Sequence, residues 1–161
     1  MKTIYLAGGC FWGVEAFFQR IKGVTNTKVG YANGDTVNPS YEDLKAHRAT
    51  HAETVMVEYD ESIIPLETVL RAYFSIIDPY SVNKQAHDEG LQYRTGIFYL
   101  NEEDHKKIMN YVNKLDGHED FKIKIEKLDN FYDAEEYHQS YLKKNPHGYC
   151  HVDLDKEFKW D

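Results

Sequence analysis

The sequence is poor in cysteine, in long apolar runs and in positive charge. Only two cysteines occur among its 161 residues, and a chain of this length can bury enough surface to fold without disulfides. No apolar run approaches the roughly 20 residues of a membrane-spanning helix. The apolar segment after Lys2 is interrupted by Gly8 and Gly9 too early for a secretory signal. The formal net charge of -8 argues against nucleic acid or an anionic membrane as the main partner.

Together these absences favour a cytoplasmic protein that is not held together by cross-links. In that compartment two cysteines are more often reactive or metal-binding than permanently paired. The hydrophobic fraction of 42% and the aromatic fraction of 14% indicate a packed core. We expect one domain over residues 1–161, with 145–161 as a C-terminal tail that carries the second cysteine. Nothing in the sequence requires more than a monomer.

The order of apolar patterns predicts a ferredoxin-like βαββαβ core. Four strands are expected from buried runs or period-two alternation, at residues 3–7, 28–31, 54–59 and 95–100. Two helices are expected from apolar residues at helical spacing, at residues 14–21 before Gly23 and 66–77 after Pro65. This order is the split βαβ pattern, which places the chain in the α/β (α+β) class as a two-layer sandwich.

Additions are expected after this core. They are a helix capped by Asn101 that runs to Leu115, an edge strand over 121–125, and a helix that runs from a capping box of Asp133 and Glu136 through Leu142. Two long stretches, 32–52 and 78–94, fit no regular element. Long ordered loops in a compact domain are often functional, so we expect them to contribute to a site.

Cys10 lies where the first strand ends and the first helix begins. Unpaired N–H groups at a helix start favour an anion, so this position is expected to lower the pKa of the thiol. Gly8 and Gly9 allow close approach of a substrate to the backbone. Phe11 and Trp12 would then wall an apolar pocket beside the thiol. The alternative is that Cys10 is a small buried residue and that both aromatic residues only pack the core.

Five segments, taken in order, carry a resemblance to one known family. They are "GCFWG" at 9–13, "NPSYEDL" at 38–44, "HAETVMVEYD" at 51–60, "DEGLQYRTGIFY" at 88–99 and "AEEYHQSYLKKNPHGYCHVDL" at 134–154. The chain resembles the type A peptide-methionine sulfoxide reductases, also called peptide-methionine (S)-S-oxide reductases, roughly from Tyr5 to Leu154. The resemblance implies an α/β sandwich on a ferredoxin-like core. It also implies reduction of the S epimer of methionine sulfoxide, free or in proteins, to methionine, and hence repair of oxidised proteins.

The resemblance assigns the redox chemistry to two cysteines and one glutamate. Cys10 would attack the sulfoxide sulfur and be left as a sulfenic acid, while Glu53 would donate a proton to the oxygen. Burial of Glu53 in an apolar pocket would keep its carboxyl protonated near neutral pH. Cys150, in "NPHGYC", matches a resolving cysteine that would form a Cys10–Cys150 disulfide. Thioredoxin, or dithiothreitol in vitro, would reduce this disulfide, and the cycle involves no bound cofactor and no metal.

The remaining site residues implied by the resemblance would hold the substrate. Tyr41 and Tyr93 match two tyrosines that hydrogen-bond the sulfoxide oxygen, and a phenol can do this without carrying net charge. Asp88 matches an aspartate that orders a water or the substrate. Phe11 and Trp12 would hold the S-methyl group and select one epimer by shape.

Several positions depart from the pattern of the family. Thr50 stands where glycine is usual, and Tyr80 stands where threonine is usual. Residues 83–88, Asn-Lys-Gln-Ala-His-Asp, stand where Asn-Arg-Gln-Gly-Asn-Asp is usual. These changes flank the residues expected to do the chemistry without replacing them, so they leave substrate affinity and loop conformation open.

Two other functions compete with the reductase. A thiol peroxidase would use the same sulfenic acid and thioredoxin recycling without a methyl pocket, and turnover on hydrogen peroxide would reveal it. A zinc-binding module would use His147, Cys150 and His151, or the pair His47 and His51, as ligands. Neither cysteine lies in a CxxC pair and nothing fixes a fourth ligand, so these spacings are a weak signal.

Overall fold

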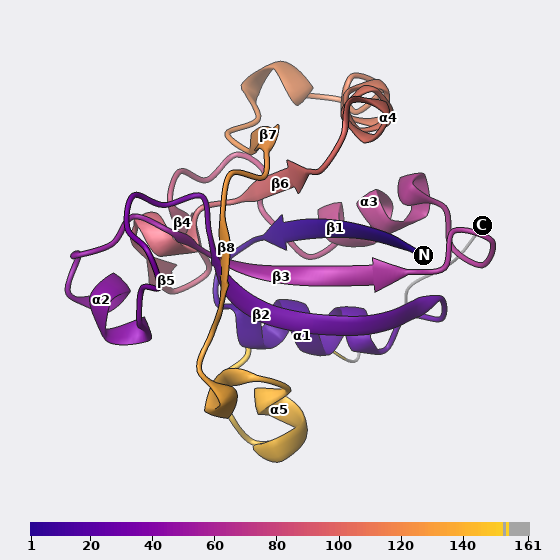
Figure 1. Cartoon of the computed structure of the whole chain (residues 1–161). Helices are drawn as coiled ribbons and strands as arrows, with labels where there is room; N and C mark the ends of the chain where they lie inside the picture. The colour runs from indigo at the N-terminus through magenta and orange to yellow at the C-terminus, as the bar shows by residue number, and fades with distance from the viewer. Residues whose placement is uncertain (153, 155–161) are drawn as a thin grey trace.

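A six-stranded sheet forms the centre of the structure, a computed structural model that describes residues 1–152 and 154 (Figure 1). Its strands are β1 (Lys2–Ala7), β2 (Val24–Ala32), β3 (Ala52–Tyr59), β6 (Gly96–Tyr99), β7 (Lys124–Lys127) and β8 (Phe131–Asp133). A separate hairpin consists of β4 (Lys84–Gln85) and β5 (Asp88–Glu89). The helices are α1 (Phe11–Gln19), α2 (Tyr41–Lys45), α3 (Leu66–Phe74), α4 (Glu102–Val112) and α5 (Tyr141–Lys144). Short 3₁₀ turns lie at Leu91–Tyr93, His118–Asp120 and Glu136–His138.

The predicted ferredoxin-like core is confirmed. The elements β1, α1, β2, β3, α3 and β6 follow one another in the chain, and the four strands lie in the sheet order β6-β1-β3-β2 with every neighbouring pair antiparallel. β7 extends one edge by pairing parallel with β6, and β8 extends the other by pairing antiparallel with β2. The C-terminal additions therefore widen the sheet by one strand at each edge.

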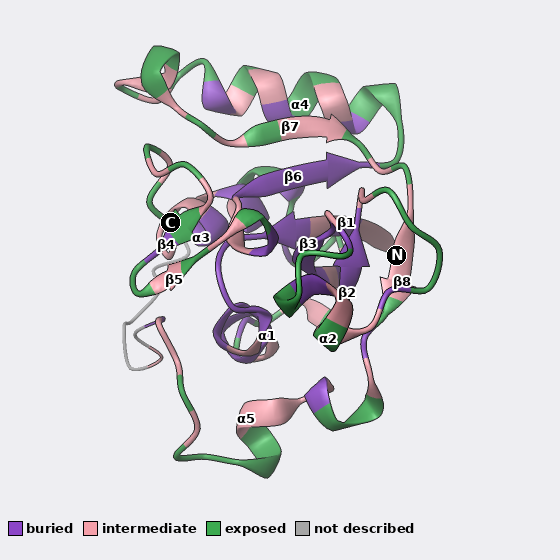
Figure 2. Ribbon diagram, turned by 90° about the vertical axis from the view of Figure 1, so that its left-hand side faces the viewer, coloured by how far each residue is buried: buried purple, intermediate pink, exposed green. Residues whose placement is uncertain are grey.

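Helices α1 and α3 pack on one face of the sheet (Figure 2). The main core therefore lies in a single layer between these two helices and the sheet. The strand register places Ile4 opposite Val57 and Leu6 opposite Val55, and all four side chains are buried. Side chains of a strand alternate between faces, so these apolar residues line the helix side together. The other face carries a smaller apolar cluster around Phe98.

One buried tyrosine fastens α3 to the strand end that leads into the first helix. The Tyr73 hydroxyl donates to the carbonyl of Ala7, at the end of β1, at 2.5 Å. It also accepts from the backbone N–H of Gly96, at the start of β6, at 3.2 Å. Because Cys10 follows Ala7 by only three residues, this hydroxyl helps to fix the backbone from which the thiol is presented.

The helix predicted from a capping box at Asp133 and Glu136 is wrong. Asp133 ends strand β8, which the sequence reasoning missed, and a helix forms only later, as the four residues of α5. The Gln139 side chain accepts from the N–H of Val29 and donates to its carbonyl, at 2.9 and 2.8 Å. These bonds to the neighbouring strand hold the backbone extended, and Ser140 then turns in the left-handed region at φ 50. Tertiary hydrogen bonds have overridden the local capping signal.

Other differences concern where elements end. α1, α3 and α4 stop at Gln19, Phe74 and Val112, a few residues before the apolar stripes do. Their final turns tighten into bonds between residues three apart, for example from the N–H of Ile76 to the carbonyl of Tyr73. The predicted edge strand lies at 124–127 rather than 121–125. The two unassigned stretches contain α2, the β4–β5 hairpin and a 3₁₀ turn. Within the described residues, no helix is long and apolar enough to cross a membrane.

Candidate active site

Cys10 occupies the N-cap of α1 and is only 8% exposed. Gly9 precedes it with φ 81, in the region that favours glycine. A Cβ on Gly9 would also lie 2.8 Å from Cβ of Gln85 and from Nε2 of His151, so a side chain would collide there. The glycine is thus required by both conformation and space. It lets the hairpin and the C-terminal segment close over the start of the helix.

The expected lowering of the Cys10 pKa is wrong. Burial is the largest influence and raises the pKa of the thiol, and the charge of Glu53 raises it further. A hydrogen bond from the backbone N–H of Trp12 acts in the opposite direction but does not prevail. The helix-start argument omitted the cost of desolvating a thiolate. Cys10 therefore rests as a protonated thiol and must lose its proton during the reaction.

Glu53, near the start of β3, is the buried acid of the site. Its side chain is 1% exposed, and Oε1 accepts from the backbone N–H of Phe11 at 3.2 Å. Oε2 is buried and has no hydrogen-bond partner among the described residues. Burial raises the pKa of this carboxyl to about 8, against the N–H of Phe11, which lowers it. A pKa of about 8 favours the protonated carboxyl at neutral pH, in agreement with the expectation from the sequence, and the second oxygen can carry the proton.

Tyr41 and Tyr93 come from the two long connecting stretches and meet at this site. Tyr41 begins α2, where Ser40 and Asp43 form a reciprocal capping box. Tyr93 ends a 3₁₀ turn, and its carbonyl accepts from the N–H of Gly9 at 3.3 Å. Burial raises the pKa of Tyr41 to about 12, while a hydrogen bond with Tyr93 opposes the rise. Burial also raises the pKa of Tyr93. Both phenols remain neutral donors over the physiological pH range.

Phe11 and Trp12 are held by a histidine that the sequence reasoning missed. The Trp12 indole N–H donates to Nδ1 of His138 at 3.0 Å, and its ring stacks on Tyr141 at a centroid distance of 3.7 Å. Phe11 and Tyr41 pack against the same buried imidazole, at 5.2 and 4.6 Å. Only the matching segment around "YHQ" points to this region in the sequence, and nothing there singles out the histidine.

Asp88 and Cys150 are joined to the site through the segment after α5. Asp88 Oδ2 accepts from the hydroxyl of Tyr149 at 2.9 Å, a contact that the sequence did not indicate. Cys150 is half-buried, and its Sγ donates to the carbonyl of Val152 at 3.1 Å. A Cβ on Gly13 would lie 3.0 Å from this sulfur, so the thiol rests against the first turn of α1. Both cysteines are free thiols.

Arg94 binds the two long stretches together beside Tyr93. Its guanidinium donates to the carbonyls of Thr50, Leu91 and Asn33, at 2.8, 3.0 and 3.1 Å. One planar group with several donors thereby holds backbone carbonyls of both stretches at once. The Thr50 hydroxyl accepts from the N–H of Asp35 at 3.0 Å, while its N–H donates to the Asp35 carboxylate at 3.2 Å.

The other two departures from the family pattern also lie in connecting segments. Tyr80 is half exposed and packs edge-on against Phe121 at 5.3 Å. Ala86 adopts φ 53, in the left-handed region where the usual glycine of the family carries no strain.

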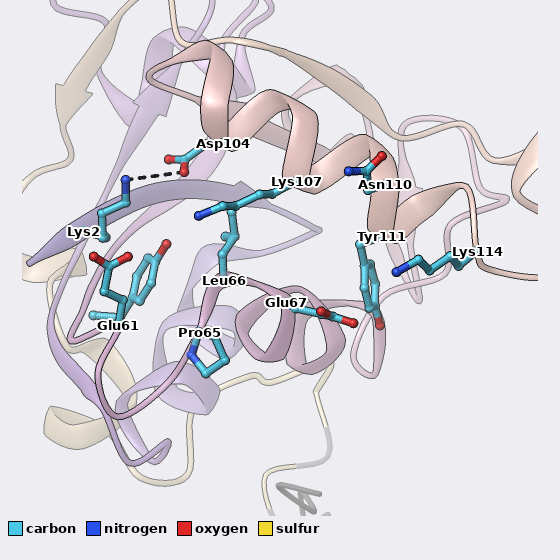
Figure 3. A pocket seen from close by; sticks show the side chains of 11 residues that line it. Lys2, Glu61, Pro65, Leu66, Glu67, Asp104, Lys107, Asn110, Tyr111 and Lys114 are labelled. Carbon is cyan, nitrogen blue, oxygen red and sulfur yellow. Dashed lines mark ion pairs between the residues drawn. The ribbon is translucent and has the colours of Figure 1, made fainter.

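A cavity of about 400 Å³ lies at the opposite end of the sheet (Figure 3). Lys2, at the start of β1, pairs there with the buried Asp104 of α4 at 3.5 Å. Cys10 follows the other end of β1, so this cavity is remote from the site described above. Among residues 1–152 and 154, no group of three or more His, Cys, Asp or Glu side chains is arranged to hold a metal ion.

Comparison with known proteins gives one family. The profile of a family described as peptide methionine sulfoxide reductase matches residues 2–160. A peptide methionine sulfoxide reductase MsrA from Lachnoclostridium phytofermentans is 57% identical over 153 residues, 94% of this chain and 92% of the relative. One from Clostridium acetobutylicum is 55% identical over 154 residues, 94% of this chain and 95% of the relative.

Solved structures agree with the sequence comparison. Reduced Mxr1 from Saccharomyces cerevisiae superposes with a TM-score of 0.89 at 36% identity, over 96% of this chain and 92% of that one. Methionine sulfoxide reductase A of Corynebacterium diphtheriae gives 0.80 at 35% identity, over 92% and 77%. Mxr1 in complex with Trx2 gives 0.61 at 30% identity, over 87% and 84%.

Proposed function

The chain belongs to the peptide methionine sulfoxide reductase family, so it reduces methionine sulfoxide to methionine, and from this premise we propose which residues perform each step. The observation that carries the proposal is the buried Glu53, whose pKa is raised to about 8 and whose Oε2 lacks a hydrogen-bond partner among the described residues. The same carboxyl is bonded to the N–H that directly follows Cys10. A proton donor and a sulfur nucleophile thus face one small region.

In the first step Glu53 donates its proton to the sulfoxide oxygen, which makes the sulfur more electrophilic and the oxygen a better leaving group. Cys10 gives up its thiol proton as it attacks that sulfur. The oxygen transfers to Cys10, methionine leaves, and Cys10 becomes a sulfenic acid. One proton leaves the thiol and one proton ends on the new sulfenic oxygen, so Glu53 finishes the step protonated. The sulfoxide sulfur is reduced by two electrons and the cysteine sulfur is oxidised by two.

The substrate is held between the two phenols and the two aromatic rings. Tyr41 and Tyr93 are neutral donors that hydrogen-bond the oxygen without adding charge to a desolvated site. Phe11 and Trp12 receive the methyl group, and the fixed orientation of Trp12 supports selection of the S epimer by shape. Asp88 accepts a hydrogen bond from the hydroxyl of Tyr149 and so restrains the segment before Cys150.

In the second step Cys150 attacks the sulfenic acid, closes a Cys10–Cys150 disulfide and releases water. The yeast relative solved with Trx2 supports thioredoxin as the reductant of that disulfide. A cavity of about 280 Å³ between α1 and the segment after α5 has Cys150 in its lining. This cavity gives a dithiol a route to that sulfur.

We also propose that residues 1–161 form one domain that acts as a cytoplasmic monomer. One sheet takes strands from both halves of the chain, which supports a single folding unit. Two free thiols that must stay reducible suit a reducing compartment. Light scattering after size exclusion would measure the oligomeric state, and a mass of twice 18.9 kDa would contradict the monomer.

The experiment that tests the function compares substrates under one reductant. The purified protein is supplied with dithiothreitol and either the S epimer, the R epimer or hydrogen peroxide. We expect rapid methionine formation from the S epimer and little turnover of the other two. Equal turnover of both epimers would contradict the shape argument. Faster consumption of peroxide would favour the thiol peroxidase.

A further inference from the structure

His151 lies directly against the start of α1, although the established reaction gives it no part. Its Nε2 is 3.0 Å from the carbonyl oxygen of Gly8. A Cβ on Gly9 would be 2.8 Å from Nε2, and a Cβ on Gly13 would be 3.4 Å from Nδ1. The imidazole therefore lies against both Gly9 and Gly13, on either side of Cys10. It fits there because neither glycine has a side chain.

The contact with Gly8 fixes the tautomer of this ring. A carbonyl oxygen can only accept a hydrogen bond, so Nε2 of His151 carries the hydrogen and Nδ1 carries a lone pair in the neutral ring. Burial lowers the pKa of His151, while the bond to Gly8 and the charge of Asp88 oppose the change. The ring is therefore neutral at pH 7. Its Nδ1 is buried and has no hydrogen-bond partner among the described residues, which calls for an explanation.

The thiol of Cys150 and this nitrogen both face Gly13 in the first turn of α1. Its Sγ and the Nδ1 of His151 are 3.0 and 3.4 Å from a single point, the place a Cβ on Gly13 would take. The thiol now donates to the carbonyl of Val152, which is not basic enough to remove the proton. Burial raises the pKa of Cys150, and a backbone hydrogen bond with Val152 and the charge of Arg20 only partly oppose this. Because the thiolate is the nucleophile, Cys150 needs a base.

We propose that Nδ1 of His151 accepts the thiol proton of Cys150 when Cys150 attacks the sulfenic acid on Cys10. This assignment deepens the proposed function, because it concerns the resolving step. The S–H bond of Cys150 breaks and a sulfur–sulfur bond forms to Cys10. The S–O bond on Cys10 breaks, and the hydroxyl leaves as water with a proton from Glu53. The imidazolium then releases its proton to solvent, from which Glu53 regains one. The Cys150 sulfur is oxidised by one electron equivalent and the Cys10 sulfur is reduced by one, so both reach the disulfide state without an outside oxidant.

The glutamine variant His151→Gln tests this role. Glutamine can still donate to the carbonyl of Gly8 but offers no basic nitrogen. Disulfide formation is timed in a single turnover without reductant, by loss of free thiols and by trapping the sulfenic acid with dimedone. The sulfenic acid is generated with the S sulfoxide in one arm and with hydrogen peroxide in the other. If the protein did not reduce the sulfoxide, no sulfenic acid would form in the first arm, but it would still form in the second. A failure of the reductase mechanism can therefore be told apart from a failure of the His151 proposal.

We expect His151→Gln to form methionine as wild type does, while disulfide formation slows by roughly 10²–10⁴-fold, the range for loss of a general base. His147→Gln is the matched control, since His147 is an exposed histidine of the same segment, and it should resolve at the wild-type rate. Cys150→Ser should accumulate sulfenic acid and form no Cys10–Cys150 disulfide, so it gives the baseline for the measured rate of disulfide formation. Should His151→Gln fail to fold, as judged by circular dichroism, His151→Asn replaces it.

The pH dependence separates a base from a structural support. The charged group that acts on His151 is Asp88 of the hairpin, and Cys150 is the residue next to His151 in the chain. The wild-type resolving rate should be flat near pH 7, because His151 is already neutral there. The variant rate should rise about tenfold for each pH unit, following the Cys150 thiolate. Added imidazole should accelerate only the variant. An unchanged resolving rate, or a slow rate that neither pH nor imidazole restores, would overturn the proposal.

Discussion

Two of the buried carboxyl groups, Asp104 and Glu53, lie at opposite ends of the sheet and differ in what lies beside them. Asp104 is 2% exposed and faces the ammonium of Lys2 at 3.5 Å. Glu53 is 1% exposed and receives a single backbone N–H, and no ion pair with it is present among the described residues. A buried carboxylate with a cation can keep its charge, whereas one without a cation keeps its proton instead. Similar burial therefore accompanies a structural contact with Lys2 at one end and, at Glu53, a carboxyl whose raised pKa suits it to donate a proton at the other.

The largest expected effect is on turnover, which should be lost on substitution at the Cys10 end of the sheet and kept on substitution at the Asp104 end. Cys10→Ser removes the nucleophile and should abolish reduction of the S sulfoxide while the protein stays folded, because serine fits the same N-cap. Asp104→Asn, at the far end, should turn over at nearly the wild-type rate. Methionine release is measured by chromatography and folding by circular dichroism. Appreciable turnover by a folded Cys10→Ser protein would remove Cys10 from the role of nucleophile.

The next effect concerns the proton. Glu53→Gln keeps the shape and the bond to Phe11 but has no acid, so methionine formation in a single turnover should fall by roughly 10²–10⁴-fold. In wild type, the same rate should decline as pH rises through about 8, where Glu53 loses its proton. This decline should be absent in Glu53→Gln. If the variant keeps the wild-type rate, the acid lies elsewhere, and Tyr41 and Tyr93 are the next groups to test.

A smaller effect is expected on the free energy of unfolding, and it should have opposite signs for substitutions of Glu53 and of Asp104. The folded-state pKa of Glu53 is raised from 4.5 to about 8, so the folded state holds a proton that the unfolded state releases in this window. Stability therefore falls as pH rises between these values, by about 1.4 kcal/mol per pH unit. Glu53→Gln lacks this loss and should be the more stable protein at pH 8, whereas Asp104→Asn breaks an ion pair and should be less stable.

Urea unfolding of the three proteins from pH 5 to pH 9 measures this difference. The free energy of unfolding of Glu53→Gln minus that of wild type should grow with pH and level off above about 8. A difference that stays flat over the range would show that Glu53 is not buried in its protonated form.

The smallest effect concerns a departure from the family pattern near the site. Ala86 has φ 53 in the turn between β4 and β5, so Ala86→Gly should relieve left-handed strain and raise the free energy of unfolding by about 0.5–1 kcal/mol. Ala72→Gly, inside helix α3, should lower it by a similar amount or more. Thermal unfolding measures both. Destabilisation by Ala86→Gly would mean that the alanine contributes contacts worth more than the strain.

The core was predictable because its signals are local and repeated. Alternation in residues 54–59 and helical spacing from Leu66 onward are each set by one face of one element. The segment 134–140 was mispredicted because its conformation depends on bonds to residues more than 100 positions away, such as Gln139 to Val29. The strand β8 is only three residues long and pairs with that same distant edge, which leaves no periodic signal.

The site residues likewise fall into those that the sequence predicted and those that it did not. Cys10, Glu53, Tyr41 and Tyr93 were predicted because they lie in segments that resemble a known family. The pKa of Cys10 was mispredicted because the sequence shows the helix start but not the depth of burial. His138 and Tyr149 were missed as site residues, and His151 was considered only as a zinc ligand. Their contacts are with Trp12, Asp88 and Gly8, each far away in the chain.

The spacing of these contacts has a consequence for how the protein comes into being. The bond from Phe11 to Glu53 joins residues 42 apart, that from Trp12 to His138 joins residues 126 apart, and that from His151 to Gly8 joins residues 143 apart. A ribosome makes Cys10 141 residues before it makes His151. Closing such long loops is slow compared with forming local structure. The newly made chain therefore exposes its nucleophile long before the groups that control it arrive, and activity should be among the last properties to emerge during folding.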